Sequence, residues 1–221
     1  MTKLSDLLLV SDIDGTLMNF PAPIPPRNIE ALRRFTAAGG RFSVATGRSI
    51  ASARPYVEQL PVNAPCILYN GCAIYDFAAE KVLRAHELPD SYAGYLSALM
   101  REREIVALSG TGYVREYLGR ENMPILEEAL TKARGPFLKA VMAMPCEWTA
   151  RVEEFGNAQG WKDVRFFRTG RPFVEMLPAE AEKGTALIEL MDLLGIPPAR
   201  TVAMGDYYND AGMLAAAGFA A

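Results

Sequence analysis

The residues best suited to chemistry are carboxylates that follow apolar runs. Asp12 and Asp14 come directly after one such run near the N-terminus, and Asp206 and Asp210 come after another near the C-terminus. An apolar run bounded by turn residues is typical of a strand buried on both faces of a sheet. Four carboxylates at one sheet edge would repel one another unless cations were present. We therefore expect a cation site. Hard oxygen ligands in a site that is meant to bind phosphate favour Mg2+ as the cation.

Other polar residues stand at comparable places. Thr46 and Asn70 end two further apolar runs, and Asn209 lies between the two C-terminal acids. Ligands of open parallel sheets gather beyond the carboxyl ends of the strands, so these side chains converge if the strands are parallel neighbours. Lys183, at the start of an expected helix, can add a positive charge to the same site.

This set predicts phosphoryl transfer by covalent catalysis. Asp12 is expected to attack phosphorus in line, while Asp14 protonates the leaving alcohol and then activates water. Mg2+, Lys183 and the Thr46 hydroxyl are expected to neutralise and orient the phosphoryl oxygens. The predicted partner is a small phosphorylated metabolite.

Each piece has a simpler reading when it is taken alone. Asp-x-Asp-Gly could begin a calcium loop, but Leu17 occupies the place of the required glycine and no glutamate closes the loop on schedule. Thr46 fits a helix cap, and Lys183 fits a solvated helix start. The segment 205–210 is the most specific single indication of a functional site, because two acids and an amide after a buried strand have no evident structural purpose. The joint occurrence of the pieces favours the catalytic reading.

The secondary-structure elements that must position these residues are strands and helices, which alternate at both ends of the chain. Asn28 is expected to cap the first helix, and two glycines to stop it. Strand–helix alternation predicts right-handed βαβ units and a parallel sheet. The expected strands are 7–11, 41–45, 65–69 and 201–204, and the expected helices are 29–38, one from residue 46, and 183–194.

The pattern changes between residues 82 and 177. Short, closely spaced strands there surround two or three helices, which indicates an antiparallel α+β module. We expect an α/β domain of residues 1–81 and 178–221, interrupted by an inserted α+β cap domain over 82–177. The expected cap strands are 105–108, 113–117, 138–144, 164–168 and 173–177.

Composition excludes several other classes of function. The 221 residues carry a formal net charge of −3, so the sequence lacks the excess of positive charge that indicates nucleic-acid binding. The three cysteines lack metal-ligand spacing and are predicted to be reduced thiols. No stretch approaches the ~20 apolar residues that span a bilayer. We expect a cytoplasmic protein with no membrane partner. A single histidine, His86, is expected at the surface, so the chemistry belongs to the carboxylates.

The sequence resembles the haloacid dehalogenase superfamily, and within it the Cof-type sugar-phosphate phosphatases with an inserted α/β cap. The resemblance covers nearly the whole chain. It rests on Asp12-Ile-Asp14-Gly-Thr16-Leu, Thr46-Gly-Arg48, Tyr69-Asn70-Gly71-Cys-Ala-Ile-Tyr75, Lys183-Gly-Thr-Ala-Leu187 and Gly205-Asp206-Tyr-Tyr-Asn209-Asp210.

The resemblance implies a Rossmann-like core with Asp12 as nucleophile and Asp14 as general acid and base. An aspartate at position 14 resembles the phosphatases and mutases of the superfamily rather than its ATPases. Mg2+ would be held by the Asp12 carboxylate, the Asp14 main-chain carbonyl and Asp206, with Asp210 in support.

The resemblance also implies a set of residues that bind the phosphoryl group. Asn70 joins the substrate-binding candidates because it ends the third expected strand. Arg48 either helps to hold the phosphate or a second anionic group, or has a purely structural role. The implied phosphoryl-binding residues are Thr46, Gly47, Lys183 and Asn209.

The cap is expected to choose the substrate by closing over the site. Glu175 could accept hydrogen bonds from sugar hydroxyls, although an outward strand position suits it equally. Basic residues that could contact the leaving group, or form a solvated face, are Arg115, Arg120, Lys139 and Arg168.

One departure from the family pattern concerns the C-terminus. Family members usually continue past the fourth motif with another strand and helices, whereas this sequence stops at residues 218–221. We therefore expect the strand at 201–204 to lose its outer neighbour and present an unpaired edge. Two alternatives stay open: a phosphomutase or phosphotransferase with the same nucleophile, and a non-catalytic phospho-accepting or ligand-binding protein. The expected assembly is a monomer or weak homodimer.

Overall fold

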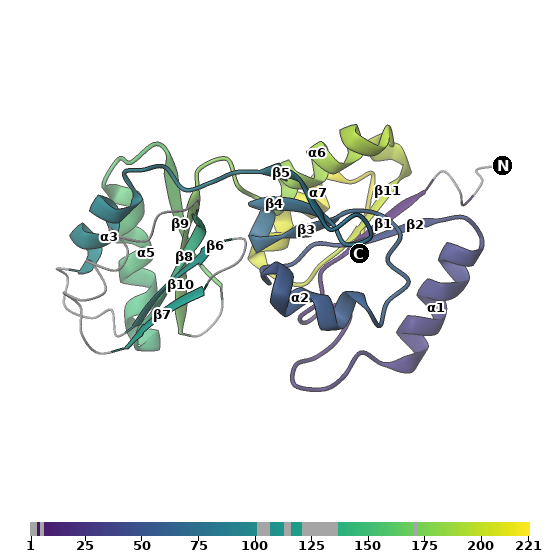
Figure 1. The fold of residues 1–221 in the computed structure, drawn as a ribbon, viewed down its shortest axis with the longest axis horizontal. Coiled ribbons are helices and arrows are strands. Elements are labelled where there is room, and N and C mark those ends of the chain that lie inside the picture. Colours follow the sequence, from purple (N-terminus) through teal and green to yellow (C-terminus); the bar gives the residue numbers. More distant parts are fainter. Residues whose placement is uncertain (1–3, 5–6, 101–106, 113–115, 121–136, 170–171) are drawn as a thin grey trace. The chain divides into compact units, whose positions relative to one another are not determined.

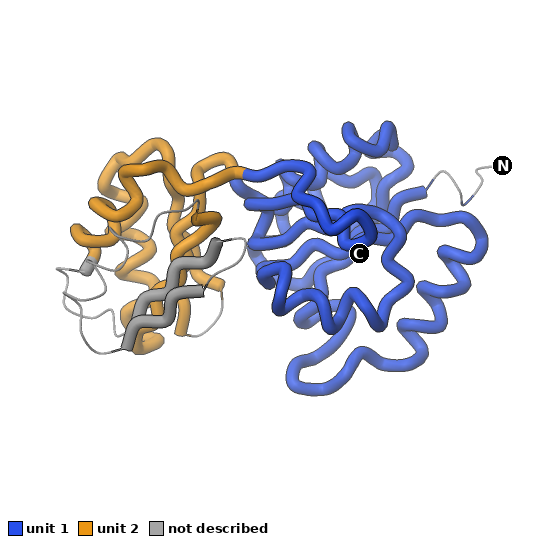
Figure 2. Tube along the Cα trace, viewed as in Figure 1, with its two compact units in different colours: residues 1–85, 181–221 blue, residues 86–180 orange. Residues whose placement is uncertain are grey.

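The chain folds into two compact units, as Figure 2 shows. Unit 1 combines residues 1–85 with 181–221, and unit 2 is the continuous segment 86–180. This is a computed structural model, which describes residues 4, 7–100, 107–112, 116–120, 137–169 and 172–221.

The centre of unit 1 is a parallel four-stranded sheet with the order β12-β11-β1-β2. In β1, Leu8 and Val10 are fully buried, as expected of a strand covered on both faces. Ser11, the last residue of β1, lies in register between Val44 and Met204, so the loop after it leaves from the middle of the sheet. The strands are β1 (Leu8–Ser11), β2 (Arg41–Val44), β11 (Thr201–Met204) and β12 (Phe219–Ala220).

Helices cover both faces of this sheet (Figure 1). On one face lie α1 (Pro26–Ala37) and α2 (Ile50–Val57), and on the other α6 (Lys183–Leu194) and α7 (Ala211–Ala216). Right-handed crossovers produce this division, because the chain leaves β1 toward one edge of the sheet and β11 toward the other. None of the described helices is long and apolar enough to cross a membrane.

The sequence-based prediction of helix starts was wrong at two positions. Asn28 does not cap α1: the helix begins at Pro26, and the Asn28 amide donates to the Leu17 carbonyl at 3.0 Å. Helix α2 is capped by Ser49, whose hydroxyl accepts from the Ser52 N–H at 3.3 Å, and not by Thr46. In each case a residue suited to capping stands near the helix start, but a different contact of the folded chain engages it.

Two further differences concern strand partners. The third expected strand is present as β3 (Cys66–Leu68), which touches β2 through the parallel bridge Ala45–Ile67. It belongs to an antiparallel sheet with two strands that the sequence analysis did not anticipate, β4 (Ala73–Asp76) and β5 (Lys81–Ala85). The expected bare edge of β11 was also wrong, because the short strand β12 pairs with it in parallel.

Unit 2 is an antiparallel sheet of order β7-β6-β8-β10-β9 with helices packed on it. The inward-facing residues alternate, for example Ala140 and Met142 on one strand and Val174 and Met176 on its neighbour. With the parallel core of unit 1, this confirms the predicted α/β fold with an inserted α+β module. Residues 105–106 and 113–115, within two expected strands, lie outside the described residues. The elements are α3 (Tyr92–Met100), β6 (Ala107–Gly112), β7 (Glu116–Arg120), β8 (Phe137–Ala143), α5 (Thr149–Ala158), β9 (Val164–Arg168) and β10 (Phe173–Pro178).

Candidate active site

The loop after β1 holds Asp12 at the carboxyl end of the sheet. Its main-chain N–H donates to the Met204 carbonyl at 2.9 Å, which continues the β1–β11 pairing for one more residue. The loop then turns back at Gly15, whose φ of 102° lies in the left-handed region that favours glycine. Asp12 therefore extends the sheet by one residue while its side chain faces the loop region, and the residue is only 6% exposed.

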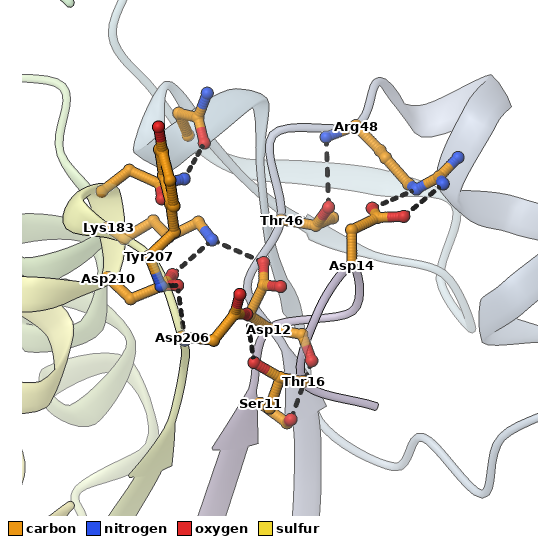
Figure 3. Close-up of polar contacts among 12 residues, drawn as sticks. Ser11, Asp12, Asp14, Thr16, Thr46, Arg48, Lys183, Asp206, Tyr207 and Asp210 are labelled. Atoms are coloured by element: carbon orange, nitrogen blue, oxygen red, sulfur yellow. Dashed lines mark hydrogen bonds and ion pairs between the residues drawn. The ribbon is translucent and has the colours of Figure 1, made fainter. Parts of the chain in front are cut away.

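Lys183 joins two buried carboxylates. Its ammonium lies 2.6 Å from Asp12 Oδ1 and 2.6 Å from Asp210 Oδ1, and the lysine side chain is 1% exposed (Figure 3). As the first residue of α6, Lys183 is delivered to the site by the start of a packed helix. A buried charge needs a partner because it has lost its hydration. The positive charge of Lys183 and the negative charges of the two carboxylates therefore stabilise one another.

The environment of Asp12 favours its protonated form. The pKa of Asp12 is raised from 3.8 to about 6, chiefly by burial and to a smaller extent by the charges of Asp210 and Asp14. The charge of Lys183 and its hydrogen bond lower the pKa but do not offset the burial. An additional cation near this carboxylate would stabilise the ionised form that a nucleophile needs.

Three carboxylates form a group that could hold such a cation. One oxygen each from Asp12, Asp206 and Asp210 lies within 4.8 Å of the others. With Lys183 as counterion, the three acids leave a formal charge of two negative units, which a divalent cation would neutralise. An all-oxygen donor set suits Mg2+. The residues present therefore fit the implied metal.

The three acids do not have equal freedom to bind. Both oxygens of Asp210 are engaged: Oδ1 by Lys183, and Oδ2 by the main-chain N–H groups of Asp206 and Tyr207 at 3.2 and 3.1 Å. The carboxylate of Asp206 is exposed, and its Oδ1 accepts from the Thr16 hydroxyl at 2.7 Å. Asp12 and Asp206 are thus the better placed metal ligands, while Asp210 shapes the loop that carries Asp206.

Asp14 faces a different partner. Figure 3 shows its carboxylate turned toward Arg48, which donates from Nε to Oδ2 and from Nη2 to Oδ1, both at 2.7 Å. The guanidinium also lies over the ring of Tyr56, 4.2 Å from its centroid. The hydrogen bond to Asp14 is the main cause that raises the pKa of Arg48, so the side chain stays charged. The structure thus assigns Arg48 a carboxylate partner that the sequence did not suggest.

The remaining polar candidates form a linked chain beside this loop. The main-chain N–H of Asn70 donates to the Thr46 carbonyl at 3.0 Å, and the side chain of Asn209 donates to Asn70 Oδ1 at 3.1 Å. A Cβ on Gly47 would come within 2.9 Å of the Asn70 amide. Asn70 itself has a left-handed φ of 58°, which is uncommon for a residue with a side chain. The folded chain therefore brings together the predicted phosphoryl-binding residues of two motifs far apart in sequence.

Two residues of this site were missed by the sequence analysis as functional candidates. Thr16 was quoted only as part of a motif, yet it orients Asp206. Its place two residues after Asp14 was the signal available. Tyr56 carried no signal, because its ring meets Arg48 only once α2 has formed.

Unit 2 contains the expected specificity residues, and its side chains pair among themselves. Lys139 lies 2.7 Å from Glu175, and both side chains are buried, so the outward position considered for Glu175 was wrong. Arg168 pairs with Glu153 at 2.7 Å. Arg115 and the side chain of Arg120 lie outside the described residues. His86, the single histidine, lies 3.6 Å from Glu180 and is not part of the acidic group.

Comparison with known proteins decides the family. The sequence matches the haloacid dehalogenase-like hydrolases over residues 9–221. The chain belongs to this family. It is 25% identical to the pyridoxal phosphate phosphatase YbhA of Escherichia coli, over 96% of this chain and 85% of that protein. It is 24% identical to the 5-amino-6-(5-phospho-D-ribitylamino)uracil phosphatase YwtE of Bacillus subtilis, over 94% of this chain and 84% of that one.

Solved structures agree with this assignment. A haloacid dehalogenase-like hydrolase from Bacteroides thetaiotaomicron superposes with a TM-score of 0.82 and 25% identity, over 96% of this chain and 86% of that one. The Cof-type resemblance is thereby confirmed, and this haloacid dehalogenase-like hydrolase is a phosphoric monoester hydrolase that acts on small phosphorylated molecules.

Proposed function

We propose that the chain hydrolyses phosphate monoesters of small metabolites with Mg2+, through an aspartyl-phosphate on Asp12. The observation that carries this proposal is the environment of that carboxylate. Lys183 holds Oδ1 at 2.6 Å, while the described residues place no hydrogen-bond donor on Oδ2. One oxygen is therefore anchored and the other is left for attack, on a side chain rigidly attached to the sheet.

The reaction follows from these positions in two steps. In the first, Asp12 Oδ2 attacks phosphorus, the bond from phosphorus to the leaving oxygen breaks, and the leaving alcohol takes a proton from Asp14. In the second, Asp14 removes a proton from water, the water oxygen bonds to phosphorus, and the bond to Asp12 breaks. Inorganic phosphate leaves and the original carboxylate returns. Lys183 and Thr46 orient the phosphoryl oxygens in both steps.

The metal would be held chiefly by Asp12 and Asp206, with Asp210 in support and the Asp14 main-chain carbonyl as a further ligand. When bound, Mg2+ supplies positive charge to the phosphoryl oxygens and reduces the repulsion among the acids. Gly15 supports this arrangement, because a Cβ at that position would overlap the Asp206 carboxylate.

The proposed substrate class is a small phosphorylated metabolite, with sugar phosphates as the first candidates. The two named relatives act on pyridoxal phosphate and on a phosphoribitylamino-uracil, which share a phosphate but differ in the leaving alcohol. A substrate panel should therefore contain both sugar phosphates and phosphorylated heterocyclic alcohols.

The decisive test is hydrolysis of p-nitrophenyl phosphate with Mg2+ and then with excess chelator. We expect Mg2+-dependent turnover that Asp12→Asn lowers by at least about 10³-fold, because the variant keeps the shape and deletes the nucleophile. Asp192→Asn, on the exposed side of α6, is the matched control and should retain wild-type turnover. Equal release of nitrophenol and inorganic phosphate separates hydrolysis from transfer to another acceptor. Near-wild-type turnover by the Asp12 variant would refute the mechanism.

A further inference from the structure

The pair of Arg48 and Asp14 has the geometry of an orienting contact. Two parallel hydrogen bonds of 2.7 Å join Nε and Nη2 to the two carboxylate oxygens. A planar guanidinium that binds in this way defines both the position and the plane of the carboxylate, which a single contact cannot do. The two side chains are 21% and 37% exposed, and pairs at such sites contribute little to folding stability. Orientation is therefore the main physical consequence of this contact.

Arg48 is itself held on three sides. Its main-chain N–H donates to the Thr46 hydroxyl at 3.2 Å, and its carbonyl accepts from the Tyr69 N–H at 3.1 Å. Its guanidinium rests on the ring of Tyr56, near the end of α2. The backbone and the guanidinium of Arg48 are therefore both held in place. For this reason the two donors, Nε and Nη2, can fix the position of the Asp14 carboxylate.

We propose that Arg48 is a positioning residue for proton transfer by Asp14. This proposal rests on the proposed function, in which Asp14 is the acid and base. While both carboxylate oxygens accept hydrogen bonds from Arg48, Asp14 cannot also donate a proton to a leaving group. One oxygen stays on the guanidinium, and the other turns to the leaving oxygen in the first step and to water in the second. This role differs from direct binding of the substrate phosphate, which the sequence alone left open for Arg48.

Leaving groups of different basicity separate the two roles. A nitrophenolate is a stable anion and departs without a proton, whereas the alkoxide of a simple alkyl phosphate needs one. A mispositioned Asp14 therefore slows alkyl phosphates selectively. Loss of a phosphate-binding cation slows both substrates equally, because both carry the same phosphoryl group. The value of kcat/KM reports this step, since it covers all events up to the first transfer of phosphorus.

The experiment compares kcat/KM for p-nitrophenyl phosphate and an alkyl phosphate in Mg2+-loaded enzyme. For Arg48→Met we expect a loss of about 100-fold with the alkyl ester, the typical effect of misplacing a catalytic group by 1 Å, and a loss of only a few-fold with the aryl ester. Arg48→Lys should recover part of the alkyl activity, because an ammonium can hold one oxygen but cannot form the two parallel hydrogen bonds. Equal losses on both esters, or no loss on either, would overturn the proposal.

Three further variants make the result specific. Arg54→Met is the matched control: this arginine lies on α2, the helix that carries Tyr56, pairs with Glu80 at 3.2 Å and should leave both rates unchanged. Tyr56→Leu removes the support under the guanidinium and should reproduce a smaller alkyl-selective loss, so the test survives if Arg48→Met folds poorly. Asp14→Asn defines the full loss of proton transfer. If it shows no alkyl selectivity, the proposed function fails; if it does and Arg48→Met does not, only the present proposal fails.

Discussion

Replacement of Asp12 by asparagine should make the metal-free protein more stable at neutral pH while it abolishes turnover. Burial raises the pKa of Asp12 from 3.8 to about 6, although the neighbouring Lys183 opposes this. The folded protein thus binds this proton more tightly than the unfolded chain, and ionisation of the carboxyl opposes folding. Asparagine has nearly the same shape and never ionises, so the variant avoids this cost.

The size of the effect follows from the two pKa values. The difference between 3.8 and about 6 corresponds to about 3 kcal/mol of unfolding free energy, at roughly 1.4 kcal/mol per pKa unit. The stabilising effect of the bound proton in the wild type is fully present below pH 3.8 and is lost as the pH rises through about 6. The advantage of the asparagine variant should therefore be near zero below pH 3.8 and reach its full size above pH 6.

Urea unfolding with excess chelator at several pH values measures this advantage. Far-UV circular dichroism is the suitable signal, because the two tryptophans, Trp148 and Trp161, both lie in unit 2 and would not report on the core. Asp192→Asn, an exposed substitution on α6, is the matched control for the loss of a carboxyl group. Addition of Mg2+ should shrink the difference, since a ligand of the native state stabilises the wild type. An Asp12 variant that is no more stable than the wild type at pH 8 would refute the reasoning.

Three other substitutions test the rest of the site. Thr16→Val should raise the Mg2+ concentration for half-maximal activity several-fold, because one hydrogen bond of about 1 kcal/mol no longer orients Asp206; titration of activity with Mg2+ measures this. Gly71→Ala should lower both stability and activity, since its φ is 99° and an added Cβ would lie 2.8 Å from the main-chain nitrogen of Lys183. Thermal unfolding and kcat compare it with Gly94→Ala, where, among the described residues and apart from its chain neighbours and its own helix backbone, no atom lies within 4 Å of the added Cβ. Lys183→Met should destabilise the protein by about 3–5 kcal/mol at neutral pH, because it leaves two buried carboxylates uncompensated, and less at acidic pH, as urea unfolding would show.

Most of the core could be predicted because its signals are local. Helix α6 has the bounds expected from the sequence, and Gly195 ends it with a φ of 65°, the left-handed conformation that glycine adopts without strain. Strand β11 also lies where its apolar run predicted. In such segments the pattern of burial and the stop signal are contained in the segment itself.

The errors occurred where a local signal competed with a distant contact. Asn28 has the side chain of a helix cap, but its amide binds the Leu17 carbonyl of the preceding loop. Strand β12 is too short to show periodicity, and it exists because Phe219 and Ala220 pair with β11. Neither contact can be read from the residues next to it.

The sequence by itself determined which chemical groups are available and on which elements they stand. Its motifs placed carboxylates at strand ends and Lys183 at a helix start, because apolar periodicity and turn residues act over a few positions. Only the tertiary structure decided how these groups pair. Lys183 meets Asp12 across 171 positions of sequence, and Arg48 meets Asp14 across 34, through contacts that depend on sheet order and helix packing. Those pairings set the charge and orientation of the two acids, and they exist only once the sheet has assembled.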